Sequence, residues 1–222
     1  MLYRILLVCL FCLCSSADGS SVVRLSLPDI ANHSGQVVRG KVASLQSYWT
    51  AAYGSRTIET KITLESVSYF KGQRSVSTLF EFTMPGGTVG DITMRIAGAP
   101  EFKQGEEWVL FLLPEWKSFP TVGLYQGAYQ LVDGTVVDGN GVPVSNIDKD
   151  GFVISALGSP KLEGRARGAS VQIQSSLKKL PADVFLAQVA AIANKSKPIT
   201  LTRDAGKRIP ADYTSVPLRK KQ

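Results

Sequence analysis

"VVRGKVASLQSYW", residues 37–49, alternates apolar or small residues with polar ones, and the alternation changes phase partway. Val38 and Val42 lie on even positions, whereas the same pattern continues on odd positions from Leu45 onward. Because successive side chains of a strand point to opposite faces, a change of phase requires a bend or a bulge. The stretch therefore predicts a strand that bends near position 44.

The following stretch, "IETKITLESVSY", changes phase in the same way. Ile58, Ile62 and Leu64 lie on even positions, and Val67 and Tyr69 continue the pattern on odd positions. Two bent strands in succession indicate a sheet that curls into a small antiparallel barrel rather than a flat sandwich. The predicted fold class is therefore mainly β.

Shorter patterns predict the remaining strands. The apolar run from Trp108 to Leu113 is typical of a strand covered on both faces, and Pro114 ends it. Asp133-Gly134 is a hairpin turn signal. The other predicted strands are residues 76–84, 92–96, 122–125, 129–132 and 136–137, with Ile92, Met94 and Ile96 on one face.

The character of the sequence changes after about residue 145. Pro181 and Asp183 are typical of the first turn of a helix, which we expect at about residues 181–194. Phe185 and Val189 have helical spacing, and we expect them to pack on the barrel. The predicted division is a segment at 1–17, a barrel domain at 18–145 and a C-terminal extension at 146–222.

Residues 1–17 have the features of a secretory signal peptide. Arg4 supplies a positive charge, residues 5–13 are apolar, and Ser15-Ser16-Ala17 supplies the small residues that signal peptidase requires. The apolar run is about ten residues long, whereas a membrane-spanning helix needs roughly 20. We therefore expect cleavage after Ala17, no transmembrane segment in the mature chain, and a secreted or periplasmic location.

Cleavage at this point would remove all three cysteines, at positions 9, 12 and 14, and leave 222 − 17 = 205 residues. The mature chain would then offer no disulfide, cysteine nucleophile or thiolate metal site. Loss of Arg4 lowers the formal charge from +7 to +6. A basic tail at residues 207–222 is either a solvated end or a contact site for anionic polymers or lipid headgroups. Its cations are Lys207, Arg208, Arg219, Lys220 and Lys221.

"PGGTVG", residues 85–90, raises a separate question because glycine clusters can bind phosphate. The motif has no Gly-Lys-Ser/Thr ending and lies between two predicted strands, so its context excludes a phosphate loop. Its glycines instead indicate a long turn with positive φ angles and close backbone approach. The alternative is an exposed recognition loop. That loop would comprise Pro85, Gly86, Gly87, Thr88, Val89 and Gly90.

The sequence offers few groups for catalysis. His33 is the single histidine, which leaves no pair for a zinc protease, and we expect it in a surface turn. Glu106 and Glu107 are adjacent, so their carboxylates would point to opposite faces of a strand. Asp138 and Asp148 begin short acidic loops that lack the closing glutamate of an EF-hand. We expect Asx turns there, with a weak structural calcium site as the alternative, and we expect neither an enzyme nor a cofactor.

The order of several motifs resembles that of the netrin-module and tissue-inhibitor-of-metalloproteinase superfamily, and more closely that of a group of secreted bacterial proteins. The resemblance covers roughly residues 35–132. It implies an OB-like five-stranded barrel. The matching segments are "VVRGKV" (37–42), "ESVSYFKG" (65–72), "PGGTVG" (85–90), residues 98–106, "FKQGEEWVLFL" (102–112) and residues 123–127.

The known inhibitory mechanism of that superfamily does not carry over to this chain. The metalloproteinase inhibitors ligate the protease zinc through a cysteine at the mature N-terminus, whereas this chain would begin at Asp18 and lack cysteine. An OB-like barrel also suggests binding of single-stranded nucleic acid, but the strands offer few basic residues and the export signal argues against it.

The expected function is that of a secreted, non-enzymatic binding module. Its partner would be a protein, with an extracellular protease as the leading candidate. The alternative is an envelope-associated structural protein that binds anionic polymer through its basic tail.

Overall fold

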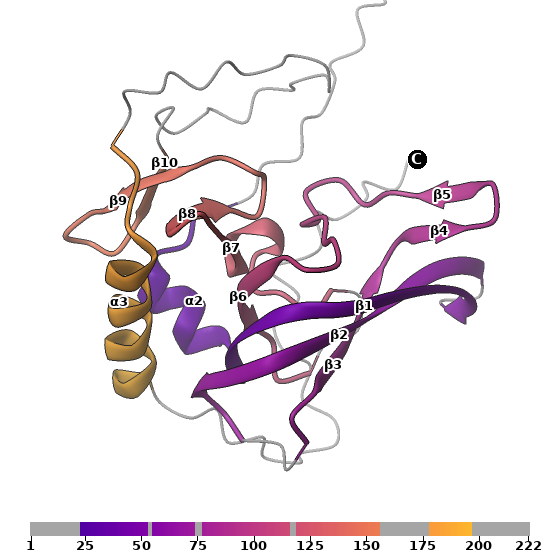
Figure 1. Ribbon diagram of the computed structural model, residues 1–222, viewed down its shortest axis with the longest axis horizontal. Coiled ribbons are helices and arrows are strands. Elements are labelled where there is room, and N and C mark those ends of the chain that lie inside the picture. Colours follow the sequence, from indigo (N-terminus) through magenta and orange to yellow (C-terminus); the bar gives the residue numbers. More distant parts are fainter. Residues whose placement is uncertain (1–22, 53–54, 74–76, 116–118, 156–177, 197–222) are drawn as a thin grey trace, which may run out of the picture.

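A computed structural model describes residues 23–52, 55–73, 77–115, 119–155 and 178–196 (Figure 1). The predicted signal segment and the basic tail lie outside these residues. The helices are α2 (Leu27–His33), the short 3-10 helix η1 (Leu124–Gly127) and α3 (Ala182–Lys195). The strands are β1 (Gln36–Ala52), β2 (Ser55–Lys71), β3 (Phe80–Pro85), β4 (Gly87–Val89), β5 (Ile92–Met94), β6 (Glu107–Leu112), β7 (Ala128–Val132), β8 (Thr135–Asp138), β9 (Val144–Ile147) and β10 (Val153–Ser155).

The described part of the chain is mainly β, as predicted, and its main feature is a large antiparallel sheet. Six strands pair in the order β3-β2-β1-β6-β7-β8, while β4–β5 and β9–β10 form separate two-stranded ribbons. Among the described residues no pairing joins the edge strands β3 and β8, so the sheet is open and not a closed barrel. The predicted strand at 92–96 does not continue the sheet, because the chain turns away at Gly86 and Gly87, which have φ angles of 99° and 134°.

The bends predicted in the first two strands are present. The β1–β2 pairing shifts register between Val42 and Ser44, next to the predicted position 44. In β2, Ser66 has a φ of 53° and lies between the paired residues Glu65 and Ser68, where the second phase change occurs. The sequence pattern therefore located both bulges correctly.

Strand β6 is buried on both faces and separates two cores, which confirms the expectation from its uninterrupted apolar run. Val109 and Phe111 belong to a helix-side core, whereas Trp108 and Leu110 belong to a strand-side core. The helix-side core also contains Leu27, Ile30, Val37, Tyr129, Val136, Val144, Phe185 and Val189. The strand-side core also contains Val38, Val42, Ile62, Leu64, Phe82, Met84 and Leu112.

Helix α3 lies within one residue of its predicted limits, and it lies beside α2 in Figure 1. Phe185 and Val189 are fully buried in the helix-side core. The ring of Phe185 lies 4.9 Å from that of Tyr129 on β7, measured between centroids. Burial of one such side chain stabilises the fold by about 1.5–3 kcal/mol.

Two local predictions are wrong. Residues 122–125 were expected to form a strand, but Gly123 and Leu124 have φ angles of 62° and 60°, which end any extended backbone and begin η1. His33 was expected in a surface turn; it is exposed, but it is the last residue of α2 and not part of a turn. That helix begins with a capping box between Ser26 and Asp29, which satisfies backbone donors at its first turn.

The hairpin turn predicted at Asp133-Gly134 joins β7 and β8, and both residues have positive φ angles, 48° and 71°.

The predicted third strand is shorter than expected, since β3 begins at Phe80 and Val76 lies outside the described residues. Strand β9 runs across position 145, where the sequence suggested a boundary.

Candidate functional site

The predicted recognition residues 85–90 lie where the chain leaves the large sheet. Pro85 is the last residue of β3, and the buried Gly86 connects β3 to β4. Gly90 lies in the turn between β4 and β5. Residues 85–90 therefore form the connection between β3 and β4 and the first half of a hairpin, rather than the single long turn expected. In Figure 1 the β4–β5 hairpin projects beside the far end of the β1–β2 ribbon. We call residues 87–94, together with residues 44–52 and 55–61, the hairpin pair.

Three hydrogen bonds tie the start of the β4–β5 hairpin to the β1–β2 ribbon, and a fourth joins the two hydroxyls of the ribbon that take part in them. The amide of Gly86 donates to the carbonyl oxygen of Ile58 at 2.8 Å, and the hydroxyl of Thr60 donates to the carbonyl oxygen of Gly86 at 2.6 Å. The amide of Thr88 donates to the Ser47 hydroxyl at 3.3 Å, and the Ser47 and Thr60 hydroxyls lie 2.8 Å apart. Each bond contributes a net stabilisation of about 0.5–1.5 kcal/mol.

Gly86 and Gly87 permit this close contact between the hairpin and the β1–β2 ribbon. Gly87 lies against the β1–β2 ribbon, and a Cβ atom there would overlap the hydroxyl oxygens of Thr60 and Ser47. A Cβ atom at Gly86 would lie 3.0 Å from the carbonyl oxygen of Met94. Positive φ angles and close backbone approach, the two roles predicted for these glycines, are both present.

Both members of the hairpin pair expose large apolar side chains. Ile92 on β5 is 56% exposed, and Tyr48 and Leu45 on β1 are 39% and 37% exposed. Ile92 was expected on one face of a strand with Met94 and Ile96. It is exposed because β5 belongs to the projecting hairpin and not to the sheet. Exposed apolar side chains are thus present on both ribbons.

The end of the β1–β2 ribbon carries an aromatic and a cationic group in contact. The Arg56 guanidinium lies 4.2 Å from the centroid of the Trp49 ring. A cation–π contact at an exposed site is worth about 0.5–1 kcal/mol. On the same ribbon, the Tyr48 hydroxyl donates to Glu59 at 3.2 Å. These contacts hold Trp49 on the same face of β1 as the exposed Leu45, and Tyr48 on the opposite face.

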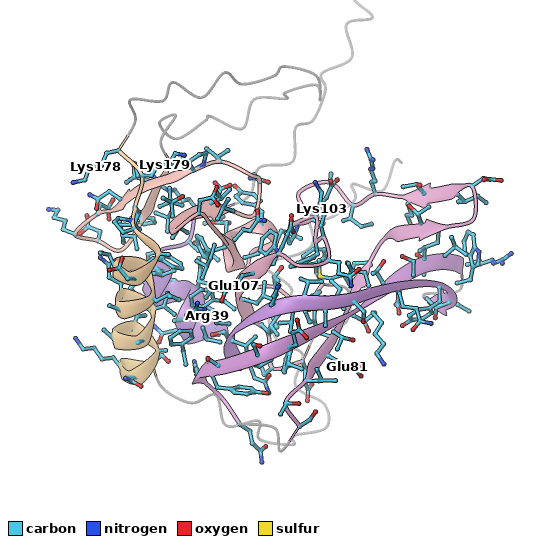
Figure 2. The ribbon with its side chains drawn as sticks, in the orientation of Figure 1. Arg39, Glu81, Lys103, Glu107, Lys178 and Lys179 are labelled. Carbon is cyan, nitrogen blue, oxygen red and sulfur yellow. The ribbon has the colours of Figure 1, made fainter. Side chains whose placement is uncertain are left out.

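The adjacent carboxylates Glu106 and Glu107 bind different partners. Glu107 accepts a hydrogen bond from Arg39 at 2.7 Å, a pair visible in Figure 2. Glu106 accepts from the Lys103 amide at 2.8 Å and from the Trp108 indole nitrogen at 3.1 Å. The two carboxylates do not converge, as the sequence predicted.

The two acidic loops are Asx turns. The Asp138 carboxylate accepts from the amides of Asn140 and Val142 at 3.0 and 2.9 Å. In the second loop the Asp148 carboxylate accepts from the amides of Asp150 and Phe152 at 3.0 and 2.8 Å. Burial raises the pKa of the Asp138 carboxyl, while the two amide donors oppose the shift.

His33 lies at the end of α2, where its Nδ1 is 2.7 Å from the Asp29 carbonyl oxygen. Within the described ranges no group of three or more His, Cys, Asp or Glu side chains is placed to hold a metal ion. None of the helices in the described part of the chain has the length and apolar character needed to cross a membrane.

Neither a family model nor a curated protein matches this chain.

The sequence did not identify Ser47 and Thr60 as the residues that fix the hairpin pair. A signal was present for Thr60, because it is polar and lies between Ile58 and Ile62, which face inward. A buried hydroxyl needs a hydrogen-bond partner, and here the partner is supplied by the Gly86–Thr88 segment.

Proposed function

We propose that this protein is an exported, non-enzymatic protein-binding module and that the hairpin pair is its recognition surface. The observation that carries the proposal is the exposure of Ile92, Tyr48 and Leu45 on two ribbons that are hydrogen-bonded to each other. Exposed apolar side chains on a rigid support can become buried against a partner without a large loss of conformational entropy.

The class of partner proposed is an extracellular protease. A projecting ridge of two ribbons is suited to a concave substrate cleft, which is the common shape of an enzyme site. The motif order that resembles the netrin and metalloproteinase-inhibitor superfamily supports the same partner class. The same resemblance implies that the sheet is a variant of the OB fold, and the bulges of β1 and β2 support this. The engagement of Glu106 and Glu107 in separate structural contacts supports a non-enzymatic role.

The test is capture of a partner by mature residues 18–222 from the secreted fraction of the source organism. Bound proteins are identified by mass spectrometry, and their proteolytic activity is measured with and without the captured chain. A specific protease whose activity falls on binding supports the proposal. Capture of no specific protein contradicts it, as does retention that disappears on deletion of residues 207–222. The second result favours polymer binding by the basic tail.

A further inference from the structure

Strand β1 is paired along only part of one side. On one side it pairs with β2 from Val37 to Ala52, whereas on the other it pairs with β6 only from Gln36 to Lys41. Val42 completes that second side through backbone hydrogen bonds of 2.8 Å with Gly105 and Glu106. From Ser44 to Ala52 no strand in the described part of the chain pairs with this side. We call this segment the open edge.

An open strand edge presents unpaired amides and carbonyls to any extended chain, and proteins normally shield such edges with charges or proline. The other edges of this sheet have such shielding. Strand β8 forms bridges with Pro143 and Pro181, and β3 carries Glu81 and ends at Pro85. The open edge, "SLQSYWTAA", has no charged residue, proline or glycine. It therefore lacks the charges and the proline that discourage pairing at the other edges.

The side chains along the open edge provide contacts on both faces of an added strand. Leu45 and Trp49 lie on one face of β1 and Tyr48 on the other. Tyr48 and Leu45 are exposed, and Trp49 is held by Arg56. An extended segment placed here would contact apolar or aromatic groups at alternate positions.

We infer that the open edge binds an extended, uncharged segment of a partner protein, which pairs with Ser44–Ala52 as an additional strand. The inference rests on the proposed function and specifies how the partner is held: backbone hydrogen bonds supply affinity, and Leu45, Tyr48 and Trp49 select apolar side chains at alternate positions. A single strand adds only about 4.8 Å to the width of the sheet. A second copy of the chain paired at the same edge would also place its own β4–β5 hairpin there, because the Thr88 amide of each hairpin is bonded to Ser47 of β1. A single extended segment is therefore the smaller occupant.

Amide hydrogen exchange on mature 18–222 tests this inference. The probe is a linear peptide selected for binding to the mature chain from a phage-displayed library. On saturation with the peptide, alternate amides between Ser44 and Ala52, those that face away from β2, should exchange at least about tenfold more slowly. Amides of β3 serve as the internal control and should not change.

Proline substitution tests whether backbone pairing is required. Because successive residues of a strand direct their amides to opposite sides, one of Thr50→Pro and Ala51→Pro removes an amide on the open edge and the other removes one paired with β2. The variant with the smaller loss of thermal stability should bind the selected peptide at least about tenfold more weakly. Unchanged affinity in that variant would overturn the inference.

Four further results would also overturn it. The first is peptide-induced protection that appears only outside Ser44–Ala52. The open-edge amides could already be protected in the free monomer, which would mean that the chain covers its own edge. Light scattering could show a dimer with these amides protected, which would identify a second copy as the occupant. If a captured protein requires Ile92 but leaves the open-edge amides unprotected, the proposed function stands and this inference fails.

Discussion

The hydroxyl of Thr60 donates a 2.6 Å hydrogen bond to the carbonyl oxygen of Gly86. This contact links β2 to Gly86, the residue at which the chain leaves the sheet. The same hydroxyl lies 2.8 Å from that of Ser47, which in turn accepts from the Thr88 amide. Thr60 thereby connects β1, β2 and the β4–β5 hairpin, which carries the exposed Ile92.

Replacement of this hydroxyl by a methyl group should destabilise the protein. Thr60→Val leaves the buried Gly86 carbonyl without its donor, and we expect a loss of about 1–2 kcal/mol in the free energy of unfolding, measured by urea denaturation. Thr88→Val is the matched control, because its hydroxyl is exposed and meets only Thr93, at 2.9 Å. The control should change the free energy by less than about 0.5 kcal/mol. Equal losses in both variants would contradict the role assigned to Thr60.

Gly87→Ala should also destabilise the protein, since the added Cβ atom would overlap the Thr60 and Ser47 hydroxyls at a φ of 134°. We expect a loss of about 2–4 kcal/mol and a corresponding fall in the thermal midpoint. Gly90→Ala separates the steric effect from the backbone effect, because Gly90 has a φ of 60° and open space around it. Its loss should be about 1 kcal/mol. If the two variants lose similar stability, the close approach at Gly87 is not present in solution.

The bulge at Ser66 can be tested with a β-branched residue. Val strongly disfavours a positive φ, so Ser66→Val should cost about 2 kcal/mol in the free energy of unfolding at this φ of 53°. Ser68→Val places the same side chain at an exposed position that pairs with Arg39 and has no positive φ, and it should change stability by less than about 0.5 kcal/mol. A harmless Ser66→Val substitution would show that β2 has no bulge at this point.

The sequence predicted the parts of the fold that depend on the alternation of buried and exposed residues. The phase changes near position 44 and near Ser66 have a direct physical meaning, because each moves the apolar face to the other side of the strand. The run from Trp108 to Leu112 likewise required apolar neighbours on both faces, and the two cores supply them.

The remaining features depend on contacts between distant segments, which alternation does not encode. The closed barrel was expected from bent strands, but closure requires β3 to pair with β8, and the chain turns out of the sheet at Gly86 instead. Ile92 was placed on one face with Met94 and Ile96 because the spacing of the three residues is that of any strand. Only the position of the β4–β5 hairpin makes it exposed. The hydroxyls of Ser47 and Thr60 acquired their role from that same position.

The buried carboxyl of Asp138 should make stability depend on pH. Burial raises its pKa above the ordinary value of 3.8. A carboxyl with a raised pKa holds its proton more tightly in the folded state, so its contribution to stability is fully present below the unfolded pKa. That contribution is lost as the pH rises through the folded pKa.

Asp138→Asn keeps an oxygen acceptor for the Asn140 and Val142 amides and cannot ionise. In denaturation experiments from about pH 3 to 7, the variant should therefore gain stability relative to the wild type as the pH rises from about 4, where an ordinary carboxyl begins to ionise. Parallel stability curves for the two proteins would mean that this carboxyl titrates as an ordinary exposed group does.

The most direct test of the recognition surface is a comparison of Ile92→Asp with Leu79→Asp in the capture assay. Both side chains are exposed, at 56% and 44%, so neither substitution should lower the thermal midpoint, but only Ile92 belongs to the hairpin pair. The surface proposed here predicts that Ile92→Asp weakens binding of the captured protein by at least about tenfold, the effect expected at an interface hot spot, while Leu79→Asp binds as the wild type does. Undiminished binding by Ile92→Asp, or an equal loss in both variants, would contradict recognition by the hairpin pair.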